Sequence, residues 1–227
     1  MRYLIVLLSL PVLFSFTFSP MQQTIELHKG QKFARYLIEN SSAETIPVIF
    51  RAVTRVQKSD GTEVNNETKE IQVFPPQMLL ASGQKKSVRV TFKGNDKFSQ
   101  EKSYRIIAQQ VPVNLSTDKK KTGIKMLLKF QNALYIRNKD YKSQLKISEY
   151  EIKNNKLHVF VTNSGNAHQY LYNVNIKFKE GKKNIEIPKK ELEKLEGQNI
   201  LANTTRHFIF NPVLGLKNNW EGQITFD

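Results

Sequence analysis

Apolar and polar residues alternate with a period of two along most of the chain, in short runs. The clearest runs cover residues 46–56, 88–92, 124–131, 157–161 and 172–178. Alternation of this kind places one face of an extended segment against a core and the other face in water, as in a half-buried β-strand. The pattern puts Val56 and Tyr172 on apolar faces and Arg55 on a polar face.

Turn residues separate these runs at near-regular spacing. They occur at Lys29-Gly30, Asp60-Gly61, Ser82-Gly83, Ser164-Gly165 and Glu180-Gly181. Many short strands with such turns predict an all-β chain built from antiparallel β-sandwiches. The segment from Pro188 to Glu196, followed by Gly197, fits a short helix or a charged loop equally well.

The length of 227 residues allows one large domain or two domains of about 100 residues each. A short polar break at Arg137–Tyr141 follows a long strand pattern, and new strand patterns begin after it. We therefore predict two sandwiches joined by a short hinge, covering residues 18–138 and 139–227. Both halves contain a strand ending in Asn-Ser, at Asn40 and at Asn163, which predicts a turn held by side-chain hydrogen bonds to the backbone.

The N-terminus has the pattern of a secretory signal peptide. Arg2 precedes an apolar run from Tyr3 through Phe16, and Ser15-Phe16-Thr17 offers a small-x-small cleavage site. We predict a signal peptide over residues 1–17, cleaved near Thr17. A membrane anchor is the alternative, but Pro11 interrupts the run, which is short for a span of about 20 apolar residues. The mature chain is expected to be exported, without stable membrane insertion.

Composition and charge exclude several classes of function. The chain has no cysteine, which removes disulfides, cysteine-ligated metals and thiol nucleophiles and makes the bacterial periplasm the better fit for an exported chain. Its four histidines lie far apart in sequence, and no catalytic motif is present, so we expect neither metal, cofactor nor enzyme. The net charge of +15 is spread over lysine-rich loops of both halves, which disfavours nucleic-acid binding.

Several short motifs, in order along the chain, resemble one known family. They are Phe18-Ser19-Pro20, the strand 37–42, Phe74-Pro75-Pro76, Leu80, Gly83-Gln84, Ser87-Val88-Arg89-Val90, Ser103-Tyr104-Arg105-Ile106 with Val111-Pro112, and the strand 157–164. Together they resemble the periplasmic chaperones of the chaperone/usher pilus pathway, the PapD-like proteins. The polar loop 116–122, with no extended apolar stretch before the next strand, suggests the short-loop branch of the family, and the uncharged residues at two anchor positions, described below, suggest that the branch is a divergent one.

The resemblance implies a fold, a function and partners. The fold would be two immunoglobulin-like sandwiches in an L or boomerang arrangement. The function would be to bind pilus or fimbrial subunits in the periplasm, to donate a β-strand to their incomplete fold, and to deliver them to an outer-membrane usher. Free protein could form a capped homodimer. The alternative is a secreted immunoglobulin-like adhesion or assembly module that binds another protein without donating a strand.

The resemblance also points to a donor strand. It would lie in the run Gly123–Tyr135, with Ile124, Met126, Leu128 and Phe130 on one face. Such a strand offers backbone hydrogen bonds and alternate apolar side chains to a groove. Alternatively, this stripe packs against the protein's own core, and for Phe130 the two interpretations are equally good.

The family also holds the subunit's terminal carboxylate with an arginine in the first strand and a lysine in the donor strand. This chain departs from that pattern, because Gln22 and Ala133 stand at the aligned positions. Arg89 and Arg105 lie within matched motifs and are the leading candidates for the carboxylate anchor. Arg35 and Lys129 are further candidates, and Gln22 could add one amide hydrogen bond. The alternative for the arginines is a solvent-facing position stacked along a sheet.

Overall fold

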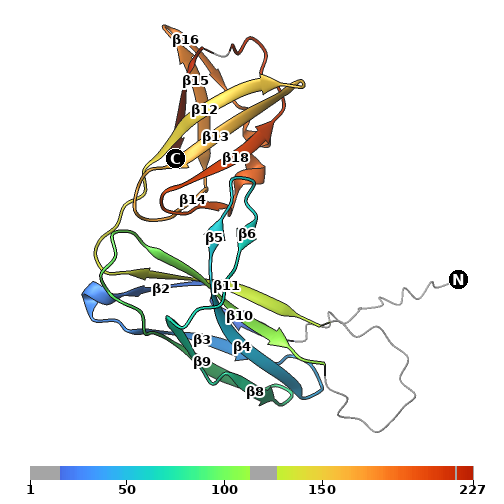
Figure 1. Ribbon diagram of the computed structural model, residues 1–227. Coiled ribbons are helices and arrows are strands. Elements are labelled where there is room, and N and C mark those ends of the chain that lie inside the picture. The colour runs from blue at the N-terminus through green and yellow to red at the C-terminus, as the bar shows by residue number, and fades with distance from the viewer. Residues whose placement is uncertain (1–15, 113–126, 218, 227) are drawn as a thin grey trace, which may run out of the picture.

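The computed structural model describes residues 16–112, 127–217 and 219–226 and shows two β-sandwiches set at an angle (Figure 1). Each sandwich encloses its own cluster of buried apolar side chains. The last strand of the first sandwich ends at Arg137 and the first strand of the second begins at Leu145, so residues 138–144 connect them. The predicted all-β fold with two sandwiches is confirmed.

The first sandwich consists of two sheets. One has the strand order β1 (Thr17–Ser19), β3 (Phe33–Glu39), β9 (Lys85–Phe92) and β7 (Ile71–Phe74). The other has the order β2 (Gln22–Glu26), β11 (Lys129–Arg137), β10 (Lys102–Gln110), β4 (Ile46–Thr54) and β8 (Gln77–Leu80). A 3₁₀ turn, η1 (Leu27–Lys29), follows β2. The short hairpin of β5 (Val56–Gln57) and β6 (Glu63–Val64) reaches from β4 toward the second sandwich (Figure 1).

The second sandwich has smaller sheets. They are β12 (Leu145–Lys153), β13 (Lys156–Asn163) and β18 (Thr204–Phe210); β16 (Lys183–Glu186), β15 (Val174–Glu180) and β19 (Glu221–Phe226); and the pair β14 (Gln169–Tyr170) and β17 (Asn199–Ile200). The segment left open between helix and loop forms a short helix, α1 (Lys189–Leu192), continued by the 3₁₀ turn η2 (Glu193–Leu195). Leu192 and Leu195 enter the core, which explains why this charged stretch is ordered as a helix.

The alternation pattern is confirmed in β9, where Val88, Val90 and Phe92 are buried and the residues between them face outward. It is wrong at Val56, which is 52% exposed, and at Arg55, which is only 8% exposed. The strand β4 ends at Thr54 and the chain leaves the sheet there, so the inward and outward positions change places. Tyr172 is also exposed, because β15 begins only at Val174.

The two Asn-Ser turns are confirmed and share one geometry. Asn40 Oδ1 accepts a hydrogen bond from the backbone N–H of Ser42, and Asn163 Oδ1 accepts one from the N–H of Gly165. Each buried Asn amide also donates to three backbone carbonyls, which fastens the strand end to a neighbouring loop. The same turn, held by a buried asparagine, therefore forms part of one end of each sandwich.

The predicted signal peptide falls mostly outside the described residues, which begin at Phe16. The Phe16 side chain is 1% exposed and belongs to the core of the first sandwich, where its ring lies 4.9 Å from that of Phe130. Across the described ranges, no helix is long and apolar enough to cross a membrane.

Candidate functional site

Strand β11 has one edge that is paired along only half of its length. On one side, β10 pairs with it from Lys129 to Ile136. On the other side, β2 runs parallel to it and pairs only from Ala133 to Arg137. Among the described residues, no strand therefore pairs with the segment 129–132 on that edge. An unpaired strand edge is a template for pairing with another chain.

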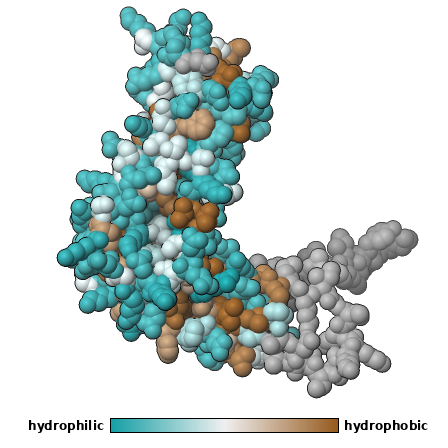
Figure 2. Space-filling model, in the orientation of Figure 1, coloured by the Kyte–Doolittle hydropathy of each residue, from teal (hydrophilic) through white to brown (hydrophobic). Residues whose placement is uncertain are grey.

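Three apolar residues lie in this half-strand or just before it, at the end of the first sandwich. Leu128 and Phe130 are half-buried and pack against the core, whereas Leu127 on the opposite face is 46% exposed. Figure 2 shows apolar side chains gathered at this end of the sandwich, beside the grey residues. For Phe130, the contacts favour membership of the protein's own core. Ile124 and Met126 lie outside the described residues, so the four-residue donor face stays a prediction.

The aligned anchor positions meet in one row across three strands. Ala133 on β11 pairs with Gln22 on β2 and with Arg105 on β10. All three residues line a cleft of about 620 Å³ between the two sandwiches. The structure therefore places the two uncharged residues at one spot, with an arginine directly beside Ala133.

Charged groups in the cleft are arranged around Glu63 from the β5–β6 hairpin. Its carboxylate accepts hydrogen bonds from Arg105 Nε and Nη2 at 2.9 and 2.7 Å and from Arg55 Nε at 2.7 Å. Burial raises the pKa of Glu63, but the hydrogen bond from Arg105 and the positive charges of Arg55 and Arg105 outweigh it, so the pKa lies below its ordinary value. With Arg206, the lining holds three arginines against one carboxylate, so the cleft attracts anions.

The other anchor candidates lie elsewhere. Arg89 pairs with Arg35 on the outer face of the other sheet, and its guanidinium stacks 4.0 Å from the centre of the Phe33 ring. This is the solvent-facing, stacked position that the sequence left open as the alternative. Lys129 is exposed at the start of β11 and does not line the cleft. Of the four basic candidates Arg35, Arg89, Arg105 and Lys129, only Arg105 lines the cleft together with Gln22.

Polar contacts on both sides of the cleft fix the two sandwiches to each other. Tyr135 of β11 accepts hydrogen bonds from Arg55 Nη1 at 3.0 Å and from Asn199 Nδ2 at 2.8 Å. The buried Glu101 carboxylate contacts Arg137 Nε and His168 Nδ1, each at 2.6 Å. These contacts join the two sandwiches, because Tyr135 and Glu101 belong to the first and Asn199 and His168 to the second.

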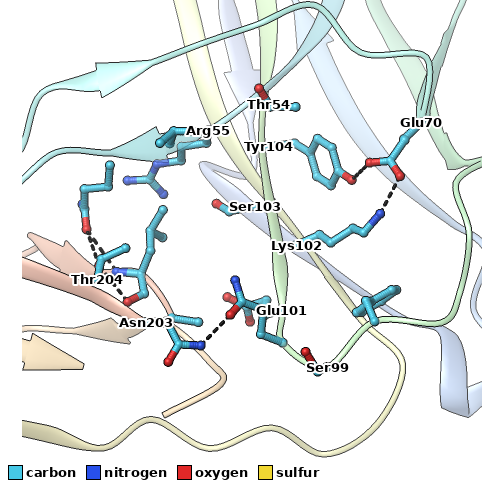
Figure 3. Close-up of a pocket in the computed structure, with 16 residues that line it drawn as sticks. Thr54, Arg55, Glu70, Ser99, Glu101, Lys102, Ser103, Tyr104, Asn203 and Thr204 are labelled. Carbon is cyan, nitrogen blue, oxygen red and sulfur yellow. Dashed lines mark hydrogen bonds and ion pairs between the residues drawn. The ribbon is translucent and has the colours of Figure 1, made fainter. Parts of the chain in front are cut away.

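A second hollow, of about 550 Å³, lies between the sandwiches as well and is drawn in Figure 3. In it the Asn203 amide donates to Gln100 across the interface, while Lys102 and Tyr104 both bind Glu70 within the first sandwich. Its polar groups are largely paired with one another. We therefore assign it to holding the interface rather than to binding.

Two groups of side chains contain potential metal ligands. Glu26, His28 and Asp140 lie close together at the surface, but both Glu26 oxygens already contact Lys29 Nζ. His158 Nδ1 and His207 Nε2 lie 2.9 Å apart on β13 and β18, although they are distant in sequence. With Lys29 occupying one group and only two ligands in the other, neither is assigned a metal.

Comparison with known proteins supports a family assignment. Residues 17–141 match the family model described as "Pili and flagellar-assembly chaperone, PapD N-terminal domain". No curated protein sequence gave a match.

Solved structures of low sequence identity share the fold. The class 5 fimbriae chaperone CfaA is 16% identical, with 92% of this chain and 97% of that chain covered and a TM-score of 0.61. The CsuC–CsuE chaperone–tip adhesion subunit complex of Acinetobacter baumannii is 18% identical, with 86% of this chain and 90% of that chain covered and a TM-score of 0.59. The structure of the Salmonella enterica SafA pilin in complex with the SafB chaperone is 15% identical, with 89% of this chain and 86% of that chain covered and a TM-score of 0.54.

The family match covers more than half of the chain, and the similar folds span nearly all of it. The proteins of this family are chaperones and not enzymes. The fold, with two immunoglobulin-like sandwiches set at an angle, and the residues that match the family model indicate the same family. The chain therefore belongs to the family of PapD-like chaperones of pilus assembly.

Proposed function

We propose that this protein is a periplasmic chaperone that donates part of β11 to the incomplete fold of a pilus or fimbrial subunit. The single observation that carries the proposal is the half-paired edge of β11, with Leu128 and Phe130 on its inner face. Export through the N-terminal signal peptide and delivery of the subunit to an outer-membrane usher complete the proposal, on the strength of the family.

The binding mode would be β-augmentation. A strand of the subunit pairs with the free edge over 129–132, and backbone hydrogen bonds provide affinity. The half-buried side chains of Leu128 and Phe130 then contact the subunit's core as well as their own. Complete burial of one such side chain contributes roughly 1.5–3 kcal/mol, which must offset the ordering of both partners. The same free edge, in unbound protein, would allow a capped homodimer.

The terminal carboxylate of the subunit would be held in the cleft by Arg105. This arginine stands beside Ala133, at the end of the row that begins with Gln22. A guanidinium binds a carboxylate through two parallel hydrogen bonds, which makes it suited to this role. Arg105 already binds Glu63 in this way, so an incoming carboxylate would share or exchange that contact.

The test compares two neighbouring leucines that face opposite ways. Leu128→Asp on the inner face, and Ile124→Asp on the predicted donor face, should abolish co-purification of the cognate subunit from the periplasm. Leu127→Asp introduces the same charge on the exposed face and should leave capture unchanged. Circular dichroism and thermal unfolding show whether each variant is folded.

The competing function is a secreted immunoglobulin-like module that binds its partner without strand donation. If folded Leu128→Asp and Ile124→Asp proteins capture the subunit at the wild-type yield, strand donation is rejected and this second function gains support. Loss of capture by all three variants alike would also contradict the proposal, because the opposite face would then matter equally.

A further inference from the structure

The outer face of the second sandwich carries two histidines in direct contact. His158 on β13 and His207 on β18 are half-buried, and His158 Nδ1 lies 2.9 Å from His207 Nε2, with the ring planes inclined by 16°. At this distance one nitrogen donates its N–H and the other accepts with its lone pair. The ring of Phe160 also stacks on His207, with the centroids 4.4 Å apart. His207 is therefore held by two side chains of the neighbouring strand.

This contact accommodates one added proton but not two. With a single added proton, one ring is an imidazolium whose N–H donates to the neutral ring in a charge-assisted hydrogen bond. When both rings are protonated, neither nitrogen can accept, so the hydrogen bond is lost and two positive charges repel each other. Burial and the positive charge of His158 hold the pKa of His207 below its ordinary value, although Glu151 raises it. The doubly charged pair therefore forms only in acid.

The charged groups of the neighbouring elements do not compensate for a doubly charged pair. Three of them are acidic and three are basic, so together they offer no surplus of negative charge to two imidazoliums. They are Glu149 and Glu151 on β12, Lys58 and Asp60 in the loop of the β5–β6 hairpin, Arg206 on β18 and Lys194 on η2.

His207 also takes part in the contact between the two sandwiches. Its backbone N–H donates to the carbonyl of Ser59, in the loop of the β5–β6 hairpin, at 2.8 Å. Gly61 of the same loop packs so closely on Arg206 that an added Cβ would meet its guanidinium. The hairpin reaches β18 from the first sandwich, while β13 pairs with β18 along its length (Figure 1). Repulsion between the two rings therefore acts on the residue that binds the hairpin loop.

We propose that the His158–His207 pair is a pH-sensitive switch in the contact between β18 and the β5–β6 hairpin. The hydrogen-bonded pair keeps His207 in place, and the hairpin loop stays bound to it. The second proton breaks the pair, displaces His207 and weakens its hydrogen bond to Ser59. The two sandwiches then lose part of their attachment in acid. This inference does not depend on strand donation.

The sign of the effect follows from the direction of the pKa change. Because the folded-state pKa of His207 is lowered, its stabilising effect is present above the ordinary value of 6.5 and is lost as pH falls through the folded-state pKa. The contact between β18 and the hairpin should therefore be intact at neutral pH and weaker in mild acid.

Ring C–H signals in NMR test the pair itself. The whole protein is titrated from about pH 8 to about pH 4.5, and the signals are identified by their loss in His158→Gln and His207→Gln. Wild-type His207 should titrate below its ordinary value of 6.5. In His158→Gln, which removes the partner's charge, it should titrate about half a pH unit or more higher. Identical His207 titration curves in wild type and His158→Gln would overturn the inference.

Hydrogen–deuterium exchange tests the link to the hairpin. Protection factors, corrected for the intrinsic exchange rate, are compared at about pH 7 and about pH 5 for residues 58–62 and 204–210. Wild type should lose protection several-fold in acid, whereas His158→Gln and His207→Gln cannot form the doubly charged pair and should lose much less. His28→Gln makes the same change at a histidine that contacts Asp140, and it should respond to acid as wild type does.

The comparison distinguishes this pair from other acid-sensitive groups in the same contact. Glu63 is present in all four proteins, so an acid response caused by Glu63 would persist in His158→Gln. Equal loss of protection in wild type and in the pair variants would therefore overturn the inference. Wild-type protection that is the same at both pH values would overturn it as well. Each pair variant is sufficient for the comparison if thermal unfolding shows the other to be unstable at neutral pH.

Discussion

Arg105 lies directly opposite Ala133 on the neighbouring strand, and both residues line the cleft between the sandwiches. The family pattern places a lysine where this chain has Ala133, so a charge missing from β11 is present one strand away on β10. A guanidinium at this place can reach the same space that a lysine on β11 would occupy. The departure at Ala133 is therefore compatible with carboxylate anchoring in the proposed function.

Glu63 should make stability depend on pH at the acid side. Its pKa lies below the ordinary value of 4.5, so its stabilising effect is present above that value and is lost as pH falls through the folded-state pKa. We expect Glu63→Gln to flatten the decline in the free energy of unfolding between about pH 6 and about pH 3. Urea unfolding at several pH values measures this. An unchanged decline would show that Glu63 is not held by its arginines.

The tip of the β5–β6 hairpin should not tolerate a side chain. Gly61 has φ of +90°, and an added Cβ would lie 2.3 Å from Arg206 Nη2. Arg206 is buried and hydrogen-bonded, so it cannot easily retreat. Gly83 has φ of +68° with open space around it and serves as the control. Both Gly→Ala changes incur about 1–2 kcal/mol of backbone strain, and Gly61→Ala should cost about 1–3 kcal/mol more.

Denaturant unfolding distinguishes the two glycines. Equal losses of unfolding free energy in Gly61→Ala and Gly83→Ala would contradict the close packing of the hairpin on Arg206.

The two buried asparagines should be essential for stability. Asn40→Ala and Asn163→Ala each remove an amide that three backbone carbonyls share, although Ala81 O keeps the N–H of Gln84 and Leu201 O keeps the hydroxyl of Thr204. Since an unsatisfied buried polar group costs about 1–3 kcal/mol, we expect a loss of about 2 kcal/mol or more from each change. Ser164→Ala, at an exposed neighbour, should stay within about 0.5 kcal/mol of wild type. Thermal unfolding compares the stability losses of the three variants. Small losses from both Asn changes would contradict the role of these asparagines in holding the two strand ends.

The fold and the family were predictable from local patterns. Alternation revealed strands such as β9, and the Asn-Ser turns revealed matching ends of the two sandwiches. These features depend on neighbours in sequence, which a single chain displays directly. The resemblance then supplied the family, because ordered motifs such as Ser103-Tyr104-Arg105-Ile106 recur at similar spacing.

The cleft was only partly predictable, because it depends on contacts between distant segments. Arg55 reads as a surface residue in the alternation, and only the departure of the hairpin from β4 buries it. Arg206 alternates with Phe208 and Phe210, which places it on the buried face of β18. Nothing in the sequence shows that Gln198 and Asn199 are its hydrogen-bond partners. His168 contacts Glu101, which lies 67 residues away in sequence. The periodicity of apolar residues does not reveal side-chain contacts of this kind.

The packing of Phe16 leads to a different expectation for signal cleavage. Cleavage near Thr17 would remove a ring that is buried in the core and contacts Phe130. Loss of that burial would forfeit roughly 1.5–3 kcal/mol. We expect the exported protein to retain Phe16, with cleavage after Ser15, a small residue suited to that position. Intact mass spectrometry of the periplasmic protein identifies the first residue of the mature chain. A mature chain beginning at Phe18 would contradict this expectation.

Hydrogen–deuterium exchange of the chaperone, alone and bound to its subunit, tests strand donation most directly. In free protein, segment 127–132 should exchange faster than segment 133–137, which β2 covers. On binding, we expect strong new protection in 127–132 and little change in 133–137. Unaltered exchange in 127–132, with protection appearing elsewhere on the molecule, would contradict the claim that this edge accepts the subunit.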